Sequence, residues 1–237
     1  MREQREGRPL QRMFSEVPHR YDIINRLFTL RLDEKWRAMA AAECLKNEPA
    51  RVLDLCTGTG DMAIRLAAKA GTRTLICGVD FSMPMLDAAR QKSAGTASGT
   101  RFVLGDAAGL PFKDGSFPVI GTAFAFRNLT FRNPNRHRHL SELLRVLMPG
   151  GKLVIVESSQ PRKRIVRFFT HLYLRAAVSF MGGLISGKPG AYRYLVYSAV
   201  NYFKPEELSE LLRAAGFNRV EYRPLLAGIA AIHVAYK

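Results

Sequence analysis

From residue 50 onward the chain alternates short apolar runs with segments of helical periodicity. The apolar runs are RVLDL (51–55), TLICGVD (74–80), RFVLGD (101–106), FPVIGTAF (117–124) and KLVIVES (152–158). Apolar residues recur at helical spacing in the segments between them, namely DMAIRLAAKA, MPMLDAARQK and NRHRHLSELLRVL. Strands that are apolar almost throughout are typical of parallel sheets, because helices cover both faces of such sheets. The alternation therefore predicts an α/β fold with a parallel sheet.

The two ends of the chain depart from this alternation. Residues 18–46 have the periodicity of two helices, and MPGG (148–151) is expected to end the helix that precedes the fifth strand. A long insertion (159–203) follows that strand. Beyond it, PEELSELLRAAG predicts a helix that stops at Gly216, and FNRVEYRPL and IAAIHVAYK predict two closing strands joined near Gly228.

We expect a single domain over residues 1–237, because the chain shows no internal repeat and no long low-complexity segment. Within this domain, residues 17–46 are expected to form a helical lid over the ligand site. Residues 159–203 are expected to form a helical insertion that faces the substrate or a membrane.

The segment VLDLCTGTGDMA (52–63) combines a strand, a tight glycine turn and the start of a helix. Gly58 and Gly60 allow the backbone to turn sharply and to approach a ligand closely, since no Cβ is in the way. Asp80 ends the second strand, where a carboxylate can accept both hydroxyls of a ribose. Asp106 ends the third strand, where it can accept the exocyclic amine of an adenine. Loops at the carboxyl ends of neighbouring parallel strands share one crevice, so these residues predict a nucleoside site.

Two further acids favour one nucleoside ligand over another. Asp54 lies in the first strand and Asp61 follows the turn, so four carboxylates surround the expected pocket. They would repel the pyrophosphate of a dinucleotide and attract the positive sulfur of S-adenosyl-L-methionine (SAM), which we therefore expect as the cofactor. Asp61 is equally explained as an acid at a helix N-terminus. Thr57 and Thr59 either bind the ligand or satisfy amides of the turn.

Positive charge is concentrated in the second half of the chain. The whole chain has 36 Lys and Arg against 20 Asp and Glu, a formal net charge of +16. Residues 1–120 carry 18 basic and 14 acidic groups, whereas residues 121–237 carry 18 and 6. This excess predicts an anionic partner, either nucleic acid or a membrane surface. Three cysteines without CxxC spacing, and a beginning that lacks the apolar core of a signal peptide, predict a cytoplasmic location that includes the inner face of the membrane.

The longest apolar run, RIVRFFTHLYLRAAVSFMGGLIS (164–186), lies in the insertion. Arg167, His171 and Arg175 recur every four residues and would form a polar stripe along one helical face. Arginines at the centre of a spanning helix are costly, so we expect this helix to lie at a membrane interface as a peripheral contact. The basic segment PRKR (161–164) would add attraction to anionic headgroups. Alternatively, the helix covers the substrate pocket and does not meet lipid.

A longer set of motifs gives a more specific resemblance. In chain order they are VPHRYDIINRLFTL (17–30), VLDLCTGTGD (52–61), GVDFSMPML (78–86), GDAAGLPFKDGSF (105–117), AFRNLTFR (125–132), LLRVLMPGGKLVIVESSQP (143–161), SGKPGAYRYL (186–195) and AGIAAIHVAYK (227–237). With this set the chain resembles the menaquinone/ubiquinone biosynthesis C-methyltransferase family of class I SAM-dependent enzymes. The likeness extends over nearly the whole chain and includes both terminal extensions.

The resemblance implies a Rossmann-like, doubly wound α/β sheet of seven strands with a C-terminal antiparallel hairpin. It implies methyl transfer from SAM to a ring carbon of demethylmenaquinol or of the ubiquinol precursor, and hence a membrane-soluble isoprenoid quinol as substrate. A homodimer is compatible with it. It adds SAM contacts to those inferred above, so that the expected cofactor site comprises Asp54, Thr57, Gly58, Thr59, Gly60, Asp80, Phe81, Asp106 and Ala107.

The resemblance also places Arg127 and Asn128 at the reacting end of the site. A quinol ring carbon becomes nucleophilic once a neighbouring hydroxyl ionises, but a phenol of pKa about 10 is mostly protonated at neutral pH. The Arg127 cation would stabilise the oxyanion, while Asn128 would orient the oxygen or a water that carries the proton. Alternatively, Arg127 forms a salt bridge with a loop acid. Tyr192 and Tyr194 either line the ring pocket or pack in the core.

Three other functions compete with this one. Amino-methylating nucleic-acid enzymes hold the amine and stack the base with an Asn/Asp-Pro-Pro-aromatic turn, whereas this chain has AFRNLTF at that place. We therefore expect no nucleic-acid partner, although an RNA methyltransferase remains an alternative because of the net charge. A phospholipid N-methyltransferase would share the SAM half and the need for a membrane, and a SAM-binding protein without activity is a third alternative. His137 and His139 do not share a helical face, so no metal site is expected.

Overall fold

The computed structural model describes residues 26, 29–95, 99–178 and 189–237, without the side chains of residues 177, 178 and 189–192. The strands are β1 (Arg51–Leu55), β2 (Leu75–Asp80), β3 (Arg101–Leu104), β4 (Phe117–Ala123), β5 (Leu147–Ser158), β6 (Arg219–Leu225) and β7 (Ala230–Tyr236). The described α-helices are α3 (Leu32–Cys44), α4 (Asp61–Lys69), α5 (Met83–Ser93), α6 (Phe126–Thr130), α7 (Arg136–Val146), α8 (Arg164–Tyr173), α10 (Pro189–Val200) and α11 (Pro205–Ala214). A π-helical turn (Leu174–Val178) extends α8, and a 3-10 turn (Leu226–Gly228) joins β6 to β7.

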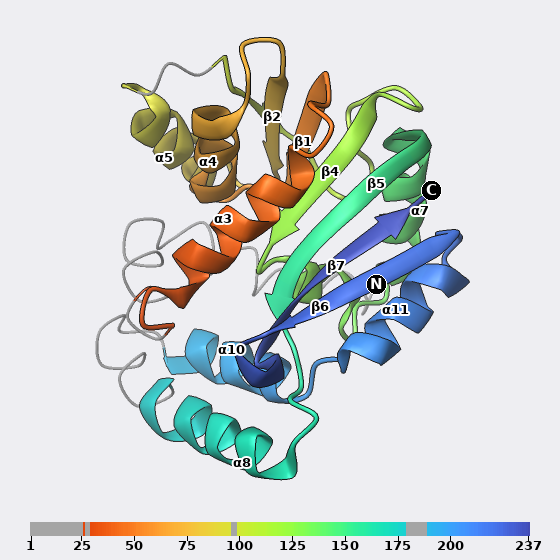
Figure 1. The fold of residues 1–237 in the computed structure, drawn as a ribbon. Coiled ribbons are helices and arrows are strands. Elements are labelled where there is room, and N and C mark those ends of the chain that lie inside the picture. The colour runs from red at the N-terminus through yellow and green to blue at the C-terminus, as the bar shows by residue number, and fades with distance from the viewer. Residues whose placement is uncertain (1–25, 27–28, 96–98, 179–188) are drawn as a thin grey trace, which may run out of the picture.

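The seven strands form one sheet in the order β3-β2-β1-β4-β5-β7-β6 (Figure 1). Strands β1 to β5 run parallel, whereas β7 runs antiparallel to both β5 and β6. This topology confirms the expected doubly wound sheet and its antiparallel C-terminal hairpin. The strand order reverses between β1 and β4, and ligands of open α/β sheets bind beside the carboxyl ends of the strands at such a switch point.

Alternate strand residues pack into two cores, one on each face of the sheet. On one face, α3 and α4 pack with Val52 of β1 and Val154 of β5. On the other face, α7 and α11 pack with Leu53 and Ile155 of the same strands. Since both faces of these strands are buried, apolar residues occupy nearly every position, which explains the sequence pattern.

Helix α3 belongs to one of these layers. Its Trp36, Ala40 and Cys44 side chains are buried in the core that also contains Val154 of β5. The described part of the expected lid (17–46) therefore includes α3, which packs against the sheet. Residues 17–25, 27 and 28 of the lid lie outside the described residues, and with them most of the first of the two helices expected there.

The structure differs from expectation at MPGG (148–151). Strand β5 already begins at Leu147, so this segment lies within the strand and does not form a separate helix stop. The register between β4 and β5 shifts between Phe117 and Val119, which accommodates the additional residues. A Cβ on Gly151 would lie 2.9 Å from a backbone carbonyl oxygen of β4, so glycine is what permits the strands to approach here.

The described parts of the insertion, residues 159–178 and 189–203, lie beyond the carboxyl ends of β4 and β5, with α8 as the outermost described helix (Figure 1). A chain of hydrogen bonds connects α8 to α10. The Nε2 atom of His171 lies 2.8 Å from Oε1 of Gln160, and Nε2 of Gln160 donates to the Ala199 carbonyl oxygen at 2.7 Å. Among the helices that the structure describes, none combines the length and the apolar character needed to cross a membrane.

Candidate active site

The loop between β1 and α4 is a tight turn that its glycines make possible. The amide of Thr57 donates to the Val79 carbonyl oxygen, and the amide of Gly60 donates to the Thr57 carbonyl oxygen, both at 2.9 Å. Gly58 and Gly60 have φ angles of +55° and +82°, which favour glycine. A Cβ on Gly60 would lie 2.9 Å from that of Ala89 on α5, whereas a Cβ on Gly58 would meet no atom within 4 Å.

Asp54 lies in β1, directly before this turn, and its side chain bonds to the turn. Its side chain is 1% exposed, and its Oδ2 accepts a hydrogen bond of 2.6 Å from the Thr57 hydroxyl. Burial raises the pKa of the Asp54 carboxyl to about 7, although the Thr57 hydrogen bond and the positive charge of Arg37 oppose the rise. The Thr57 hydroxyl is thus committed to the loop itself. Asp54 places a titratable charge under the turn without direct contact with solvent.

Asp80, at the end of β2, links two neighbouring loops. Its Oδ2 accepts from the Gly58 amide and its Oδ1 accepts from the Ser82 amide, both at 2.9 Å. Burial raises the pKa of this carboxyl, while these backbone hydrogen bonds oppose the rise. Each carboxylate oxygen can accept a second hydrogen bond, so Asp80 retains capacity for ribose hydroxyls. Phe81 follows at the surface and is 37% exposed.

Thr59 and Asp61 converge on a lysine of α5. The Nζ atom of Lys92 lies 2.8 Å from Oγ1 of Thr59 and 2.9 Å from Oδ1 of Asp61, and Arg26 approaches Asp61 at 3.5 Å. Burial alone would raise the pKa of Asp61, but the hydrogen bond and charge of Lys92, together with Arg37 and Arg26, lower it. Asp61 is the first residue of α4, so its charge also lies at the positive end of that helix. The carboxylate is therefore already paired with cations of the protein.

Asp106 and Ala107 follow β3 at the same edge of the sheet. Asp106 is exposed, its Oδ1 accepts from the Ala108 amide at 2.8 Å, and its carbonyl oxygen accepts from the Gly109 amide. Ala107 is buried in the core. The loop therefore presents a carboxylate at the edge of the sheet while its neighbouring side chain anchors the turn.

The chemistry of these loops fits SAM. The α-carbon of Gly58 borders open space, so a ligand can lie against the turn without a Cβ in its way. Asp80 and Asp106 offer oxygens that accept hydrogen bonds from hydroxyl and amine groups of a nucleoside. Asp54 adds negative charge that attracts a sulfonium, when the carboxyl is ionised.

Arg127 lies at the carboxyl edge of the sheet, on the short helix α6, and is 7% exposed. Its Nη1 donates to Oε1 of Glu157 at 3.2 Å and to Oγ of Ser158 at 2.6 Å, and its backbone amide donates to Oε2 of Glu157 at 3.0 Å. The Nε–H of Arg127 is buried and has no hydrogen-bond partner among the described residues. A buried guanidinium with an unused donor is suited to an oxygen anion that arrives from outside the protein.

Three other residues are expected to act on the substrate with Arg127, namely Asn128, Tyr192 and Tyr194. Tyr194 of α10 is half-buried; burial raises the pKa of its hydroxyl, and the nearby Arg127 charge opposes the rise. Asn128 is half-buried, and its carbonyl oxygen accepts from the Asn133 side chain. Tyr192 lies on α10, but its side chain is outside the described residues.

Glu157 and Ser158 are site residues that the sequence analysis missed. The salt bridge foreseen as an alternative for Arg127 exists, but its partner is on β5 and not in the loops after β1 to β3. The available signal was the polar pair that follows LVIV at the end of the strand. Polar residues at the carboxyl end of a central parallel strand lie at the ligand edge of the sheet.

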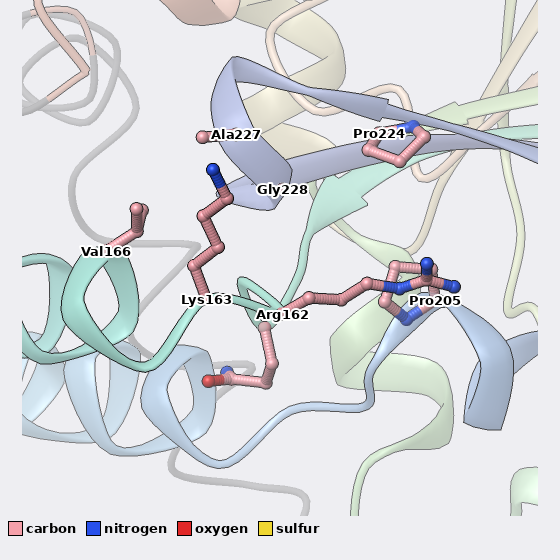
Figure 2. Close-up of a pocket in the computed structure, with 8 residues that line it drawn as sticks. Arg162, Lys163, Val166, Pro205, Pro224, Ala227 and Gly228 are labelled. Carbon is pink, nitrogen blue, oxygen red and sulfur yellow. The ribbon is translucent and has the colours of Figure 1, made fainter.

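A separate cavity of about 320 Å³ lies where the segment between β5 and α8 meets the turn between β6 and β7 (Figure 2). Its lining residues are Gln160, Arg162, Lys163, Val166, Pro205, Pro224, Ala227 and Gly228. Arg162 is held there by hydrogen bonds to Glu206 and Tyr222. None of the expected cofactor or catalytic residues lines this cavity, so it is distinct from the site built around Arg127.

Comparison with known proteins identifies relatives along the whole chain. The sequence profile of the ubiE/COQ5 methyltransferase family matches residues 1–237. A demethylmenaquinone methyltransferase of Thermus thermophilus is 44% identical over 222 residues, which cover 94% of this chain and 98% of the relative. The protein of the same name from Deinococcus radiodurans is 42% identical over 234 residues, which cover 99% of this chain and 95% of the relative.

The solved structures show the same fold. A SAM-dependent methyltransferase from Thermotoga maritima matches with a TM-score of 0.65 at 21% identity, covering 96% of this chain and 99% of that one. The expected class I methyltransferase architecture is thereby confirmed.

Proposed function

The chain belongs to the ubiE/COQ5 methyltransferase family, and we propose that it transfers a methyl group from SAM to a ring carbon of demethylmenaquinol or of the equivalent ubiquinol precursor. The observation that carries this function is the match over residues 1–237, together with 44% identity to a demethylmenaquinone methyltransferase. Both relatives described above have that name, which favours the naphthoquinol as substrate. Neither phospholipid N-methylation nor RNA methylation has a comparable observation in its favour.

The cofactor would lie along the loops that follow β1, β2 and β3. When bound, SAM supplies a methyl group on a positively charged sulfur. Gly58 would leave room for the ligand, Asp80 would accept from the ribose and Asp106 from the adenine. Asp54 would favour the sulfonium through its buried charge. Thr59 would bind at the same turn, where Lys92 already fixes its hydroxyl.

Arg127 would act on the quinol. Ionising a phenol of pKa about 10 at neutral pH is unfavourable unless a cation stabilises the oxyanion. The unpartnered Nε–H of Arg127 offers such a charge-assisted hydrogen bond inside the protein, where water competes little. Asn128 and Tyr194 would orient the ring beside it, and Tyr192 remains a further substrate residue of this proposal.

The outer face of α8 supports a peripheral membrane contact. All ten residues of α8 are at least partly exposed, and five large apolar side chains on it are between 41% and 62% exposed. They are Ile165, Phe168, Phe169, Leu172 and Tyr173, and we call them the apolar face of α8. Their spacing places them on one side of the helix, while His171 on the other side bonds to the body of the protein. An apolar stripe that points away from the protein is unusual in water.

The positive charge around this face favours contact with an anionic lipid surface. Eight Lys or Arg and no acid lie between Glu157 and Glu206, and Arg162, Lys163 and Arg164 lead directly into α8. Basic residues beside an apolar helical face favour anionic headgroups by about 1 kcal/mol per cation. A membrane-resident quinol would also reach the site from this side. We therefore place the enzyme at the inner face of the membrane.

Methyl transfer from labelled SAM in detergent tests the activity. Demethylmenaquinol, the demethylated ubiquinol precursor, phosphatidylethanolamine and total RNA are offered in parallel. Label on a quinol ring carbon is expected, and the Arg127→Gln variant should lose about 100-fold or more in kcat while binding SAM normally. Arg90→Gln is the control, because Arg90 pairs with Asp87 at the surface. Label on lipid or RNA alone would refute the proposed function.

Vesicle flotation tests the membrane contact. The protein should float with vesicles that contain anionic lipid and stay in solution with neutral vesicles. The double variant Phe168→Ser/Phe169→Ser should lose binding, whereas Leu75→Ser, which changes an equally exposed residue of β2, should not. A second copy of the chain, and not the membrane, covers the apolar face of α8 if flotation fails and light scattering shows a dimer for the wild type but not for the double variant.

A further inference from the structure

Glu157 carries a buried carboxylate whose acceptor sites are shared between Arg127 and Ser158. Its Oε1 accepts from Nη1 of Arg127 at 3.2 Å, from the Ser158 amide at 2.9 Å and from the Ser158 hydroxyl at 3.0 Å. Its Oε2 accepts from the Arg127 amide at 3.0 Å. The Glu157 residue is 1% exposed. A carboxylate this deep in the protein can exchange a proton only through a neighbouring group.

The hydroxyl of Ser158 is that neighbouring group. It donates to Glu157 and accepts from Nη1 of Arg127 at 2.6 Å, which leaves one lone pair for another donor. Ser158 is half-buried, whereas Glu157 is sealed from solvent. A substrate hydroxyl that donates to this lone pair is connected through Ser158 to the Glu157 carboxylate and lies beside the Arg127 guanidinium.

Charge balance favours proton movement along this connection. The Arg127–Glu157 pair is neutral as a whole, and ionising a quinol beside it would add a buried negative charge. If the proton moves to Glu157, the oxyanion takes over the Arg127 cation and the net charge of the site does not change. Arginine itself cannot accept the proton, because its pKa is too high.

Building on the function proposed above, we propose that Glu157 is the proton acceptor of the reaction and that Ser158 relays the proton. The O–H bond of the quinol breaks, its proton moves to Oγ of Ser158, and the hydroxyl proton of Ser158 moves to Oε1 of Glu157. The electron pair stays on the quinol oxygen, where Arg127 stabilises it. After the ring carbon has been methylated and has lost its hydrogen as a proton to water, Glu157 returns its proton to the oxygen.

Two other titratable groups of the described residues face this pair. Tyr202, which follows α10, bonds to the Thr130 hydroxyl at 3.1 Å; burial raises its pKa, and the negative charge of Glu157 adds to the rise. Burial likewise raises the pKa of Tyr194 on α10. Both phenols therefore stay protonated near neutral pH, and neither competes with Glu157 as an acceptor.

The dependence of kcat/KM for quinol on pH, measured between pH 7 and 9 at saturating SAM, tests the relay. The wild-type value should be nearly constant, because an internal acceptor takes the proton. In Glu157→Gln and in Ser158→Ala, only quinol that is already ionised reacts, so kcat/KM should fall at pH 7 and rise about tenfold per pH unit. A quinol with an electron-withdrawing substituent and a lower phenol pKa should restore both variants at pH 7.

Two control variants separate a proton relay from a structural role. Ser158→Thr keeps the hydroxyl and should keep the wild-type pH profile. Glu142→Gln changes a carboxylate that also bonds an arginine and a backbone amide, outside the site, and should leave the profile unchanged. Variants that lose activity equally at every pH would overturn the relay. Absence of quinol methylation by the wild type would instead refute the proposed function, so the two failures are distinguishable.

Discussion

At the scale of single residues, Gly58 and Gly60 show that one loop can contain two glycines for different reasons. Both have positive φ, but an added Cβ would collide with another element only at Gly60, where it would lie 2.9 Å from that of Ala89. We predict that Gly58→Ala weakens SAM binding at least tenfold and costs only about 1–2 kcal/mol in the free energy of unfolding, from left-handed backbone strain. Gly60→Ala should destabilise the fold more, because its Cβ would collide with α5. Calorimetric titration with SAM and urea denaturation measure the two effects.

Binding of SAM to Gly58→Ala with wild-type affinity would contradict this prediction, because it would mean that the ligand does not lie against the turn. Equal loss of stability in both alanine variants would contradict the assigned role of Gly60. The pair is matched in loop, residue type and sign of φ, so the difference between the variants isolates the space around each α-carbon.

Asp54 makes the charge of the site depend on pH. Burial raises the pKa of its carboxyl to about 7, so its negative charge develops as the pH rises through neutrality. We predict that the affinity for SAM increases between pH 6 and 8 relative to the affinity for S-adenosylhomocysteine, whose sulfur is neutral. Titration calorimetry with both ligands measures the ratio. The ratio should become independent of pH in Asp54→Asn, and a constant ratio in the wild type would argue against a sulfonium beside this carboxylate.

At the scale of elements, the sequence predicted a strand wherever burial alone determines which residues form it. Strands β1 to β5 were predictable because burial of both faces demands apolar residues along the whole strand. The start of β5 at Leu147 was not, because it depends on a register shift against β4 and on the close approach at Gly151. The bond between Arg127 and Glu157 was also out of reach, since the two residues are 30 positions apart and meet only when β4 and β5 pair.

Helices α8 and α11 are a natural comparison, since both have ten residues and an amphipathic pattern. Helix α11 buries Leu208 and Leu212, whereas α8 buries no residue. We predict that the amides of α8 exchange with deuterium much faster than those of α11 in solution, because few buried contacts oppose local opening. Vesicles with anionic lipid should slow exchange in α8 only. Strong protection of α8 without lipid, measured by mass spectrometry, would show that another surface already covers it.

At the scale of the whole molecule, the cofactor loops, α10 and α8 lie one beyond the other (Figure 1). Asp80, Asp106 and Arg127 lie at or just after the carboxyl ends of β2, β3 and β4. Helix α10 lies beyond these strand ends, and α8 is outermost (Figure 1). This order fits a substrate whose ring must reach the sheet while its chain remains in lipid. The Asp54 carboxyl is buried beneath the glycine turn, and burial of an ionisable group lowers the stability of the whole fold when that group is charged.

The Asp54 carboxyl has a pKa of about 7 in the folded protein, against about 3.9 in an unfolded chain. The folded state therefore binds the proton more tightly, and stability is lost as the pH rises from about 4 to about 7. We predict that Asp54→Asn, which cannot ionise, gains stability relative to the wild type over this range, by up to about 4 kcal/mol in the absence of ligand. Urea denaturation of both proteins at pH 4, 5, 6 and 7 measures the difference. All other acids are common to the two proteins and cancel, so a difference that does not change with pH would mean that Asp54 ionises in the fold as readily as in water.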